Sequence, residues 1–449
     1  MFDNMAVLQL PVNPLDEEQL KLKIKIINKI VPLGHQKGLL IYFGDVFPNY
    51  NSLFNRLPVN PTNQYSATDF IGDIQKNTQF DDPFTYSLEP GGQLEWASAP
   101  AISLWNIQDQ FKRHVAIEDS LCKKNSIDRL YLSLEPFCKP DDIDLITMNK
   151  YQLMDNLFKK SGHLGPWMMR NTTSVQLNID FTSEEDANEM AFLADIIQPL
   201  FSILFSNSPF MRGKPVGNTN MRWKIWEDTD LGRCRSLFDH GIRTQNKIVD
   251  DYSNWLPGVK SIFKYNDNGD AEYYDGTLGE MIQSDPNKSK SHILSALHQS
   301  FTHVRFKTVL EVRASDRPPK GMEMAPAAFL SGLLTALKTR GKLREAIARW
   351  SNNERKALIR SGNNLSFDQV GPQNKTVREW LEFLSDLALN GLDERAANFR
   401  IKNERPLLQP FVENVLKNGP KSIQTQNAFE RDGGSLNKFL KHYCSDTIS

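Results

Sequence analysis

The chain has 449 residues, which is enough for a large buried core and, by length alone, for two or three domains. Its 53 basic and 54 acidic residues give a net charge of −1, so bulk charge does not drive binding to nucleic acid or to an anionic membrane. The composition, 40% hydrophobic and 24% charged, is that of a soluble globular protein, and no apolar run reaches the length of a membrane span.

The cysteines are scattered along the chain, at Cys122, Cys138, Cys234 and Cys444. Without Cys-x-x-Cys spacing they predict neither a disulfide framework nor a zinc site. The N-terminus lacks a basic region followed by an apolar one, so no secretory signal is expected. Together these features predict a cytoplasmic protein with reduced thiols.

The first predicted elements are a helix over 15–31 and a short apolar strand over 38–43. Residues 1–36 are therefore expected to form an N-terminal helical extension. Residues 48–82 are rich in Asn, Pro and Asp, a composition typical of irregular structure.

The middle of the chain alternates predicted strands with long excursions. Strands are predicted over 84–96 (broken at Pro90-Gly91-Gly92), 170–181 and 306–313, helices over 103–125 and 184–206, and a polar loop over 266–277. From residue 325 the chain is mostly helical, for example over 325–361 and 376–400. The order predicts an α+β fold with one mixed or antiparallel sheet. Because no linker or repeat interrupts it, we expect one catalytic-type domain over 1–449, with a mainly helical portion over 325–449.

The segment 170–181 alternates with a period of two, as a β-strand requires. Its apolar face would hold Val175, Leu177, Ile179 and Phe181. Its polar face would hold Arg170, Thr172, Ser174, Gln176, Asn178 and Asp180. This mixture of an arginine, amides, hydroxyls and a carboxylate favours the wall of a cavity for a charged small molecule over a plain solvated face.

Two further segments carry charged groups of shared strand parity. Glu89 and Glu95 flank a glycine turn, and two convergent carboxylates suit Mg²⁺; a hairpin with two exposed glutamates is the alternative. Arg305, Lys307, Glu311 and Arg313 share one face, which suits triphosphate and metal; a solvated ion-pair face is the alternative.

The loop over 207–233 is dense in Pro and Gly, and its Arg222, Lys224 and Arg233 could clamp a carboxylate. The chain has no Gly-x-x-x-x-Gly-Lys-Ser/Thr motif, which argues against a nucleotide site of the P-loop type.

Five stretches together carry a resemblance to a known family. They are Ser87-Leu-Glu-Pro-Gly-Gly-Gln-Leu-Glu95, Met168-Met-Arg-Asn-Thr-Thr-Ser-Val-Gln-Leu-Asn-Ile-Asp-Phe181, Ile197-Gln-Pro-Leu-Phe-Ser-Ile-Leu-Phe-Ser-Asn-Ser-Pro-Phe210, Arg222-Trp-Lys-Ile-Trp-Glu-Asp-Thr-Asp230 with Arg233, and Leu310-Glu-Val-Arg313 followed by Ala325-Pro-Ala-Ala-Phe329. In this order they resemble the plant and proteobacterial type of glutamate–cysteine ligase.

The resemblance implies a glutamine-synthetase-like fold, in which a curved antiparallel sheet forms a funnel flanked by helices. It also implies ATP and Mg²⁺ as cofactors and a γ-glutamyl phosphate intermediate on the way to glutathione. The partners would be amino acids, without nucleic acid or membrane, bound by a monomer or homodimer.

Carried over residue by residue, the resemblance implies the following roles. The metal ligands would be Glu89, Glu95 and Glu311, the amino-acid pocket would contain Arg170, Gln176, Asn178, Arg222 and Arg233, ATP would contact Arg305, Lys307 and Arg313, and the catalytic arginines would be Arg222 and Arg313.

One departure concerns the first strand, where the family has a Glu-x-Glu pair. Leu40 and Tyr42 stand in those positions, and Asp45 has the opposite parity. Three hypotheses follow: a glutamate-dependent ligase, a related ligase with a different amino-acid acceptor, or a catalytically impaired relative that binds a ligand or partner.

Overall fold

The computed structural model describes residues 21–23, 25–26, 41–47, 49–51, 57–79 and 82–446. Residues 21–23 and 25–26 are helical, within the helix predicted over 15–31. The rest of the predicted extension over 1–36, like Leu40, lies outside the described residues. Cys122 and Cys234 are buried free thiols. No helix in the described ranges is long and apolar enough to cross a membrane.

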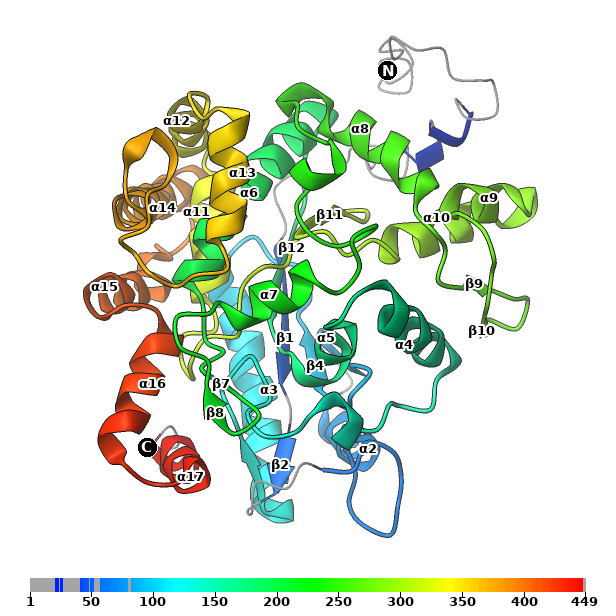
Figure 1. The fold of residues 1–449 in the computed structure, drawn as a ribbon, viewed down its shortest axis with the longest axis vertical. Coiled ribbons are helices and arrows are strands. Elements are labelled where there is room, and N and C mark those ends of the chain that lie inside the picture. The colour runs from blue at the N-terminus through cyan, green and yellow to red at the C-terminus, as the bar shows by residue number, and fades with distance from the viewer. Residues whose placement is uncertain are drawn as a thin grey trace.

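A six-stranded sheet lies at the centre of the fold (Figure 1). Its strands are β1 (Ile41–Phe47), β3 (Thr85–Leu88), β4 (Leu94–Ala97), β6 (Val175–Ile179), β11 (Val304–Phe306) and β12 (Leu310–Val312). Their order is β11-β12-β6-β1-β4-β3, and every neighbouring pair is antiparallel. The predicted α+β class with antiparallel strands is confirmed.

Strand β6 shows how the sheet separates its two faces. Val175, Leu177 and Ile179 are buried, whereas Gln176 and Asn178 between them are half-buried. The apolar side chains join one large hydrophobic core with residues of α3 (Leu104–Asn125), α6 (Glu184–Leu204) and α11 (Ala325–Thr335). The alternation in the sequence thus decides which face meets the core.

Helix α6 is buried almost along its whole length. Ser183 caps it by accepting a hydrogen bond from the Asp186 backbone N–H at 3.0 Å, and three acidic residues in the first turn complement the helix dipole. A helix that is apolar on all sides is stable only when it is surrounded by other elements. Here the sheet and the C-terminal helices surround it.

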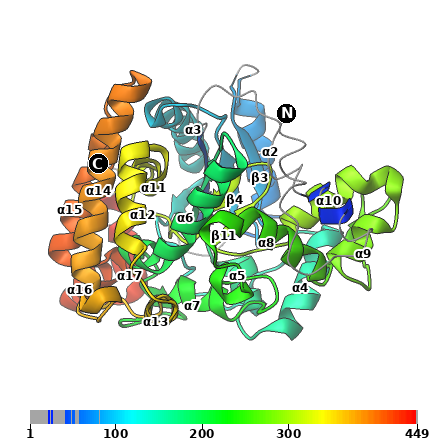
Figure 2. The same cartoon turned by 90° about the horizontal axis from the view of Figure 1, so that it is seen from above.

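The C-terminal helices stand together beside the sheet, opposite α9, α10 and the hairpin β9–β10 (Figures 1 and 2). They are α11, α12 (Leu337–Ile347), α13 (Asn352–Ser361), α14 (Val377–Phe399), α15 (Gln409–Asn418), α16 (Lys421–Asp432) and α17 (Leu436–Asp446). Helices α11 and α14 approach closely because each has a glycine at the contact. A Cβ on Gly391 would lie 2.0 Å from the Gly332 carbonyl oxygen, so a larger residue would force the helices apart.

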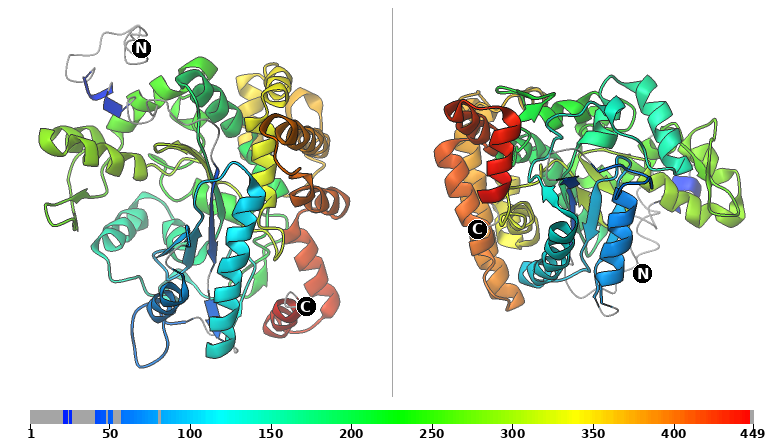
Figure 3. Two further views of the ribbon diagram at one scale, coloured as in Figure 1. Left: turned by 180° about the vertical axis from the view of Figure 1, so that it is seen from behind. Right: turned by 90° about the horizontal axis from the view of Figure 1, so that it is seen from below.

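The remaining elements are short and lie around this framework (Figure 3). The helices are α2 (Ala67–Asn77), α4 (Asn149–Ser161), α5 (Gly165–Asn171), α7 (Met221–Glu227), α8 (Ile248–Trp255), α9 (Leu278–Gln283) and α10 (Ser289–His298). The strands are β2 (Asn49–Asn51), β5 (Ile127–Arg129), β7 (Phe210–Met211), β8 (Lys214–Pro215), β9 (Lys264–Tyr265) and β10 (Ala271–Glu272). Single 3₁₀ turns cover Pro140–Asp142, Phe238–His240, Gln245–Lys247, Leu256–Gly258, Pro286–Lys288, Pro372–Asn374 and Arg405–Leu407.

Most predicted elements are present, and the differences have local causes. The helices predicted over 103–125, 184–206 and 376–400 correspond to α3, α6 and α14. The prediction of irregular structure over 48–82 is wrong at Ala67–Asn77, where a capping box between Ser66 and Asp69 starts helix α2. The single strand predicted over 306–313 is wrong too, because the chain turns at Lys307–Val309 and forms the hairpin β11–β12.

A buried ion pair ties the C-terminal helices to the start of α3. Arg395 Nε lies 2.9 Å from Glu404 Oε2, and both side chains are at most 1% exposed. Glu404 also accepts from the Leu104 backbone N–H at 2.6 Å, and Arg395 donates to the Ile102 carbonyl at 2.9 Å. Both charges are therefore satisfied without water.

We expect Arg395→Met to lower the free energy of unfolding by about 3–5 kcal/mol, because it leaves Glu404 charged and buried. Arg405→Met is the matched control, since Arg405 forms a partly exposed ion pair with Asp393 at 2.9 Å and its loss should cost less than about 1 kcal/mol. Denaturant unfolding followed by circular dichroism measures both, and equal losses would contradict the structural role of the buried pair.

Candidate functional site

A cavity of about 320 Å³ lies at the polar face of the sheet. Of the residues predicted from the sequence, its lining includes Glu89, Glu95, Gln176, Arg222, Arg305, Lys307 and Arg313. They come from the β3–β4 turn, β4, β6, α7 and the β11–β12 region, which are far apart in the chain. We call this space the main cavity.

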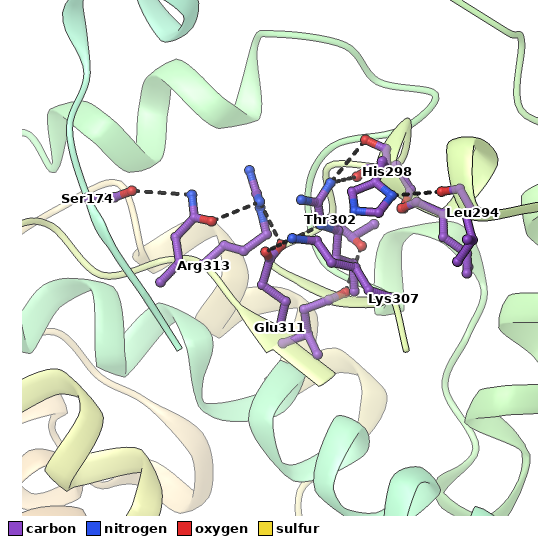
Figure 4. Close-up of polar contacts among 12 residues, drawn as sticks. Ser174, Leu294, His298, Thr302, Lys307, Glu311 and Arg313 are labelled. Atoms are coloured by element: carbon purple, nitrogen blue, oxygen red, sulfur yellow. Dashed lines mark hydrogen bonds and ion pairs between the residues drawn. The ribbon is translucent and has the colours of Figure 1, made fainter. Parts of the chain in front are cut away.

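A buried carboxylate, Glu311 of β12, organises the cations beside the main cavity (Figure 4). Glu311 Oε2 pairs with Arg305 Nε and, at 2.7 Å, with Arg313 Nη1. Glu311 Oε1 lies 2.5 Å from Lys307 Nζ. Both oxygens of this carboxylate are therefore occupied by cations of the chain itself.

The electrostatics of this cluster favour a charged Glu311. Burial acts to raise the pKa of the Glu311 carboxyl, but Arg305, Lys307 and Arg313 outweigh it and hold the pKa well below the usual range. Three cations around one carboxylate leave a local excess of positive charge. That excess attracts an anion entering the main cavity.

The hairpin turn keeps the sequence prediction for these residues valid despite the corrected topology. Arg305 and Glu311 are direct cross-strand partners, so an even separation along the chain still places them on one face. The guanidinium of Arg305 is further held by the carbonyls of Ser300, at 2.7 Å, and His298, at 3.2 Å.

Arg313 connects the cation cluster to strand β6. Its Nη1 donates to Gln176 Oε1 at 3.4 Å, and Gln176 Nε2 reaches Ser174 Oγ at 3.4 Å (Figure 4). The guanidinium also lies over the rings of Trp226, at 5.3 Å, and Phe301, at 5.8 Å. These contacts fix the orientation of Arg313 while it still lines the cavity. Phe301 lies outside every periodic segment, so no sequence pattern predicts its place in the site.

Two glutamates form an acidic part of the same cavity. Burial and, next to it, the charge of nearby Glu95 raise the pKa of the Glu89 carboxyl to about 7, against the opposing effect of Arg313 and Lys150. Glu95 accepts a hydrogen bond from Ser87 Oγ at 2.5 Å. Within the described part of the chain, neither carboxylate has an ion-pair partner. A cation bound there would offset this repulsion.

The glycine turn positions Glu89 as the sequence predicted. Gly92 has φ of +79°, the left-handed region that a side chain disfavours, and its N–H donates to the Glu89 carbonyl at 2.8 Å. Gly91 has no room for a Cβ, which would lie 2.7 Å from the Arg170 Cα. The Glu89 backbone is thereby held against α5.

The predicted convergence of Glu89, Glu95 and Glu311 on one metal is not present in this structure. Among the described residues, no three carboxylate, imidazole or thiol groups are arranged to hold an ion. The reason is that Glu311 is already paired with three cations. Glu89 and Glu95 alone line the main cavity as an uncompensated pair.

Arg222 of α7 lines the main cavity and forms an ion pair with Asp316. Its Nη1 lies 3.8 Å from Asp316 Oδ1, its Nη2 donates to the Arg313 carbonyl at 3.1 Å, and its Nε has no hydrogen-bond partner in the described chain. Burial lowers the pKa of Arg222 to about 10, although Asp316 opposes the shift. A buried guanidinium with a free donor can bind a carboxylate by donating a hydrogen bond to it.

Two arginines predicted for the amino-acid pocket lie elsewhere. Arg233 lines a separate cavity, where it pairs with Asp230 at 2.9 Å and donates to the carbonyls of Gln299 and Lys260. Arg170 belongs to helix α5, since the strand begins only at Val175, and its Nη1 pairs with Asp155 at 2.5 Å. The predictions of an Arg222–Arg233 clamp and of Arg170 on the strand face are wrong. Both arginines have buried protein partners instead.

The pairing of strand β1 with β4 and β6 shows which β1 positions lie beside the polar face, where the family has its acidic pair. Tyr42, Gly44 and Val46 lie opposite Asn178, Gln176 and Glu95, so these three positions share a row with the polar face and none is acidic. Asp45 lies opposite Val175 and Trp96, which are buried in the core. Asn178 itself is in register with Glu311 but is not part of the cavity lining.

Comparison with known proteins gives a consistent family. A family model described as Glutamate-cysteine ligase family 2(GCS2) matches residues 56–370. A chloroplastic glutamate–cysteine ligase A from Oryza sativa subsp. indica is 31% identical over 323 residues, covering 69% of this chain and 63% of that protein. The chloroplastic enzyme from Arabidopsis thaliana is 32% identical over 321 residues, covering 69% and 60%. The chain thus spans less than two thirds of these relatives' length.

A solved structure shares the fold. Glutamate–cysteine ligase from Francisella tularensis, in complex with AMP, superimposes with a TM-score of 0.57 at 14% identity and covers 92% of this chain and 88% of its own. The cytoplasmic location predicted from the sequence is contradicted by the plant relatives, whose names place them in the chloroplast. Reduced cysteines suit any reducing compartment, so they could not distinguish between the two.

We expect Glu311→Gln to cost about 3–5 kcal/mol of unfolding free energy at pH 7, because three cations lose their buried counter-charge. The low pKa of Glu311 means that its stabilisation is complete above the ordinary carboxyl value and is lost as pH falls through the lower folded value. The variant should therefore lose less stability than the wild type on acidification. Urea unfolding across pH measures this, with Glu272→Gln, from a partly exposed ion pair with Lys264, as control. A loss below about 1 kcal/mol would contradict the role of Glu311.

Proposed function

Because the chain belongs to glutamate-cysteine ligase family 2, we propose that it joins the γ-carboxylate of glutamate to the amino group of cysteine with ATP. The observation that carries the proposal is one cavity that combines an acidic pair, Glu89 and Glu95, with a cation cluster, Arg305, Lys307 and Arg313. A ligase of this kind has to bind a nucleoside triphosphate, a metal ion and a dicarboxylic amino acid at the same place.

The polar face of the six-stranded sheet is, in this proposal, the wall of a substrate funnel with helices outside. The strand order supports this role, because the acidic pair and the cation cluster come from opposite edges of the sheet. A substrate that spans both therefore lies across the sheet, over Gln176 of β6.

The cation cluster is proposed to bind the ATP phosphates. Guanidinium groups present paired donors that match phosphate oxygens, and Lys307 adds a compact charge. Glu311 holds Arg305, Lys307 and Arg313 in place before the nucleotide arrives. Preorganised donors stabilise the charge that develops during phosphoryl transfer without reorganising at that moment.

The acidic pair fits Mg²⁺, since two half-buried carboxylates without ion-pair partners among the described residues are the hard oxygen ligands this ion prefers. When bound, the ion would neutralise phosphate charge during transfer. The β1 positions Tyr42, Gly44 and Val46 contribute no carboxylate, so Glu89 and Glu95 would supply the protein ligands.

Arg222 is proposed to hold a carboxylate of glutamate, with its unpartnered Nε directed to that task and Asp316 fixing its position. Gln176, which accepts a hydrogen bond from Arg313, adds its side-chain amide to the same wall. These contacts would place the γ-carboxylate near the phosphate-binding cations.

The proposed reaction has two steps. A γ-carboxylate oxygen of glutamate attacks the γ-phosphorus of ATP, a new O–P bond forms, and ADP leaves. The cysteine nitrogen then attacks the acyl carbon, loses a proton, and inorganic phosphate leaves with its oxygen. Arg313 and its neighbours stabilise the phosphate charge in both steps.

The direct test incubates purified protein with ATP, Mg²⁺ and glutamate, with and without cysteine, and follows ADP release and the dipeptide by mass spectrometry. Cysteine-dependent formation of γ-glutamylcysteine supports the proposal. Screening other amino acids in place of cysteine identifies the acceptor. Absence of ADP release with every acceptor would overturn the ligase assignment.

We expect Arg222→Lys to raise KM for glutamate by roughly tenfold or more, with a smaller effect on KM for ATP, because lysine keeps the charge but loses the paired donors. Arg233→Lys is the control, since Arg233 lies in a separate cavity and should leave KM for glutamate unchanged. Steady-state kinetics measures KM for glutamate and for ATP separately. Equal effects on both substrates would count against Arg222 as the group that binds the glutamate carboxylate.

We expect Glu89→Gln to weaken Mg²⁺ activation by roughly tenfold or more, because one of two protein ligands is lost. Glu382→Gln, at an exposed position of α14, is the charge-matched control. Activity is measured against Mg²⁺ at fixed ATP, and Mg²⁺ affinity is measured separately by calorimetry. An unchanged Mg²⁺ dependence would remove Glu89 from the metal site.

A further inference from the structure

A second polar cavity, of about 560 Å³, lies among the last helices and shares no lining residue with the main cavity. It is bounded by α16, the end of α15, α17 and the loop at Pro319. We call it the α16 cavity. Apart from Pro319, its lining residues lie outside residues 56–370, the part of the chain matched by the family model. Figure 1 shows α16 and α17 near the C-terminus, away from the sheet.

One face of α16 supplies most of the lining. Lys421, Gln424, Thr425, Ala428 and Arg431 follow the spacing of a single helical face. The other side chains of the lining are Pro319, Asn418, Asn427 and Tyr443. The described lining residues thus include two cations and several amides but no carboxylate.

Lys421 is a partly buried cation without a carboxylate partner in the described chain. Its Nζ contacts two neutral oxygens, Asn414 Oδ1 at 2.5 Å and Gln424 Oε1 at 3.1 Å. Burial accordingly lowers the pKa of Lys421, with no acidic group opposing the shift. Arg431, at the other end of the same face, makes no ion pair with any described residue. Both charges are therefore available to an anion.

Thr425 supplies a second, independent observation. Its side chain is 6% exposed, yet its hydroxyl makes no hydrogen bond to any described residue. Some buried hydroxyls on other helices bond to the preceding turn, as Thr335 Oγ1 does to the Ser331 carbonyl at 2.6 Å and Ser253 Oγ to the Val249 carbonyl at 2.7 Å. The Thr425 hydroxyl makes no such bond, and because Thr425 lines the cavity its hydroxyl is free to donate to a ligand there.

We propose that the α16 cavity binds a small metabolite through an oxyanion, either a phosphate or a carboxylate group. Lys421 and Arg431 supply the counter-charge, Thr425 donates a hydrogen bond, and the amide of Asn427 contacts the remainder of the ligand. Because no acidic side chain is among the described lining residues, none of these residues repels such a ligand.

The test is calorimetric titration with pyrophosphate for the phosphate source and citrate for the carboxylate source. Because the cations of the main cavity can also bind anions, the titrations are made in an Arg313→Gln background, which leaves α16 intact. We expect one binding event per chain in that background. The probe that binds more tightly identifies the source of the oxyanion.

Three substitutions locate the binding event. Arg431→Gln, at an exposed position, should weaken binding about tenfold, and Thr425→Val, which keeps the side-chain shape, about threefold. Lys417→Gln is the matched control, because it also removes one positive charge. Lys417 is an exposed residue of α15 outside the cavity lining, so its substitution should leave affinity unchanged. Thermal unfolding checks that each variant is folded.

Two results would overturn the proposal. One is the absence of binding of either probe at millimolar concentration. The other is an equal loss of affinity in Lys417→Gln and Arg431→Gln, which would show attraction by overall charge alone. Since the readout is binding rather than ligation, failure here would leave the proposed ligase activity unaffected, and the converse also holds.

Discussion

The main cavity depends on one buried carboxylate, that of Glu311. A lone carboxylate in this position would be protonated, and three cations in this position without it would repel one another and stay near water. Together they form a cluster whose geometry is fixed on both oxygens of Glu311. The ion pairs to Glu311 stabilise the cluster. Because the cluster has more positive than negative charge, it still attracts anions.

The order of strands distributes charge across the cavity. The β11–β12 hairpin lies at one edge of the sheet and the β3–β4 hairpin at the other, with β6 and β1 between them. The sheet therefore separates the cations from the acidic pair, and no ion pair forms between the two groups among the described residues. This separation leaves Glu89 and Glu95 without ion-pair partners in the described chain, and it leaves the cations to the substrate.

The C-terminal helices are connected to the main cavity by two hydrogen bonds and one ion pair. Ser422 of α16 accepts from the Ser208 backbone N–H at 2.7 Å, and Ser208 Oγ donates to Asp316 at 2.6 Å. Asp316 in turn lies beside Arg222. The position of Arg222 thus rests on α16 as well as on its own helix, although the two regions are about a hundred residues or more apart in the sequence.

The sequence by itself determined the elements whose signal is local. Period-two alternation gave β6 and its polar face, the glycine turn gave the β3–β4 hairpin and the position of Glu89, and even spacing placed Arg305 and Glu311 on one face even though a turn lies between them. The resemblance carried by five short stretches gave the family. These features depend on neighbouring residues, so one chain contains enough information to predict them.

Only the tertiary structure decided which charged groups are available to a ligand. Arg170, Arg222 and Arg233 looked alike in the sequence, yet Arg170 and Arg233 are paired with buried aspartates, whereas Arg222 keeps a free donor. Glu311 and Glu89 also looked alike, yet one is held by three cations and the other is not. An ion pair forms between residues that folding brings within about 4 Å, and local sequence patterns carry no information on those partners.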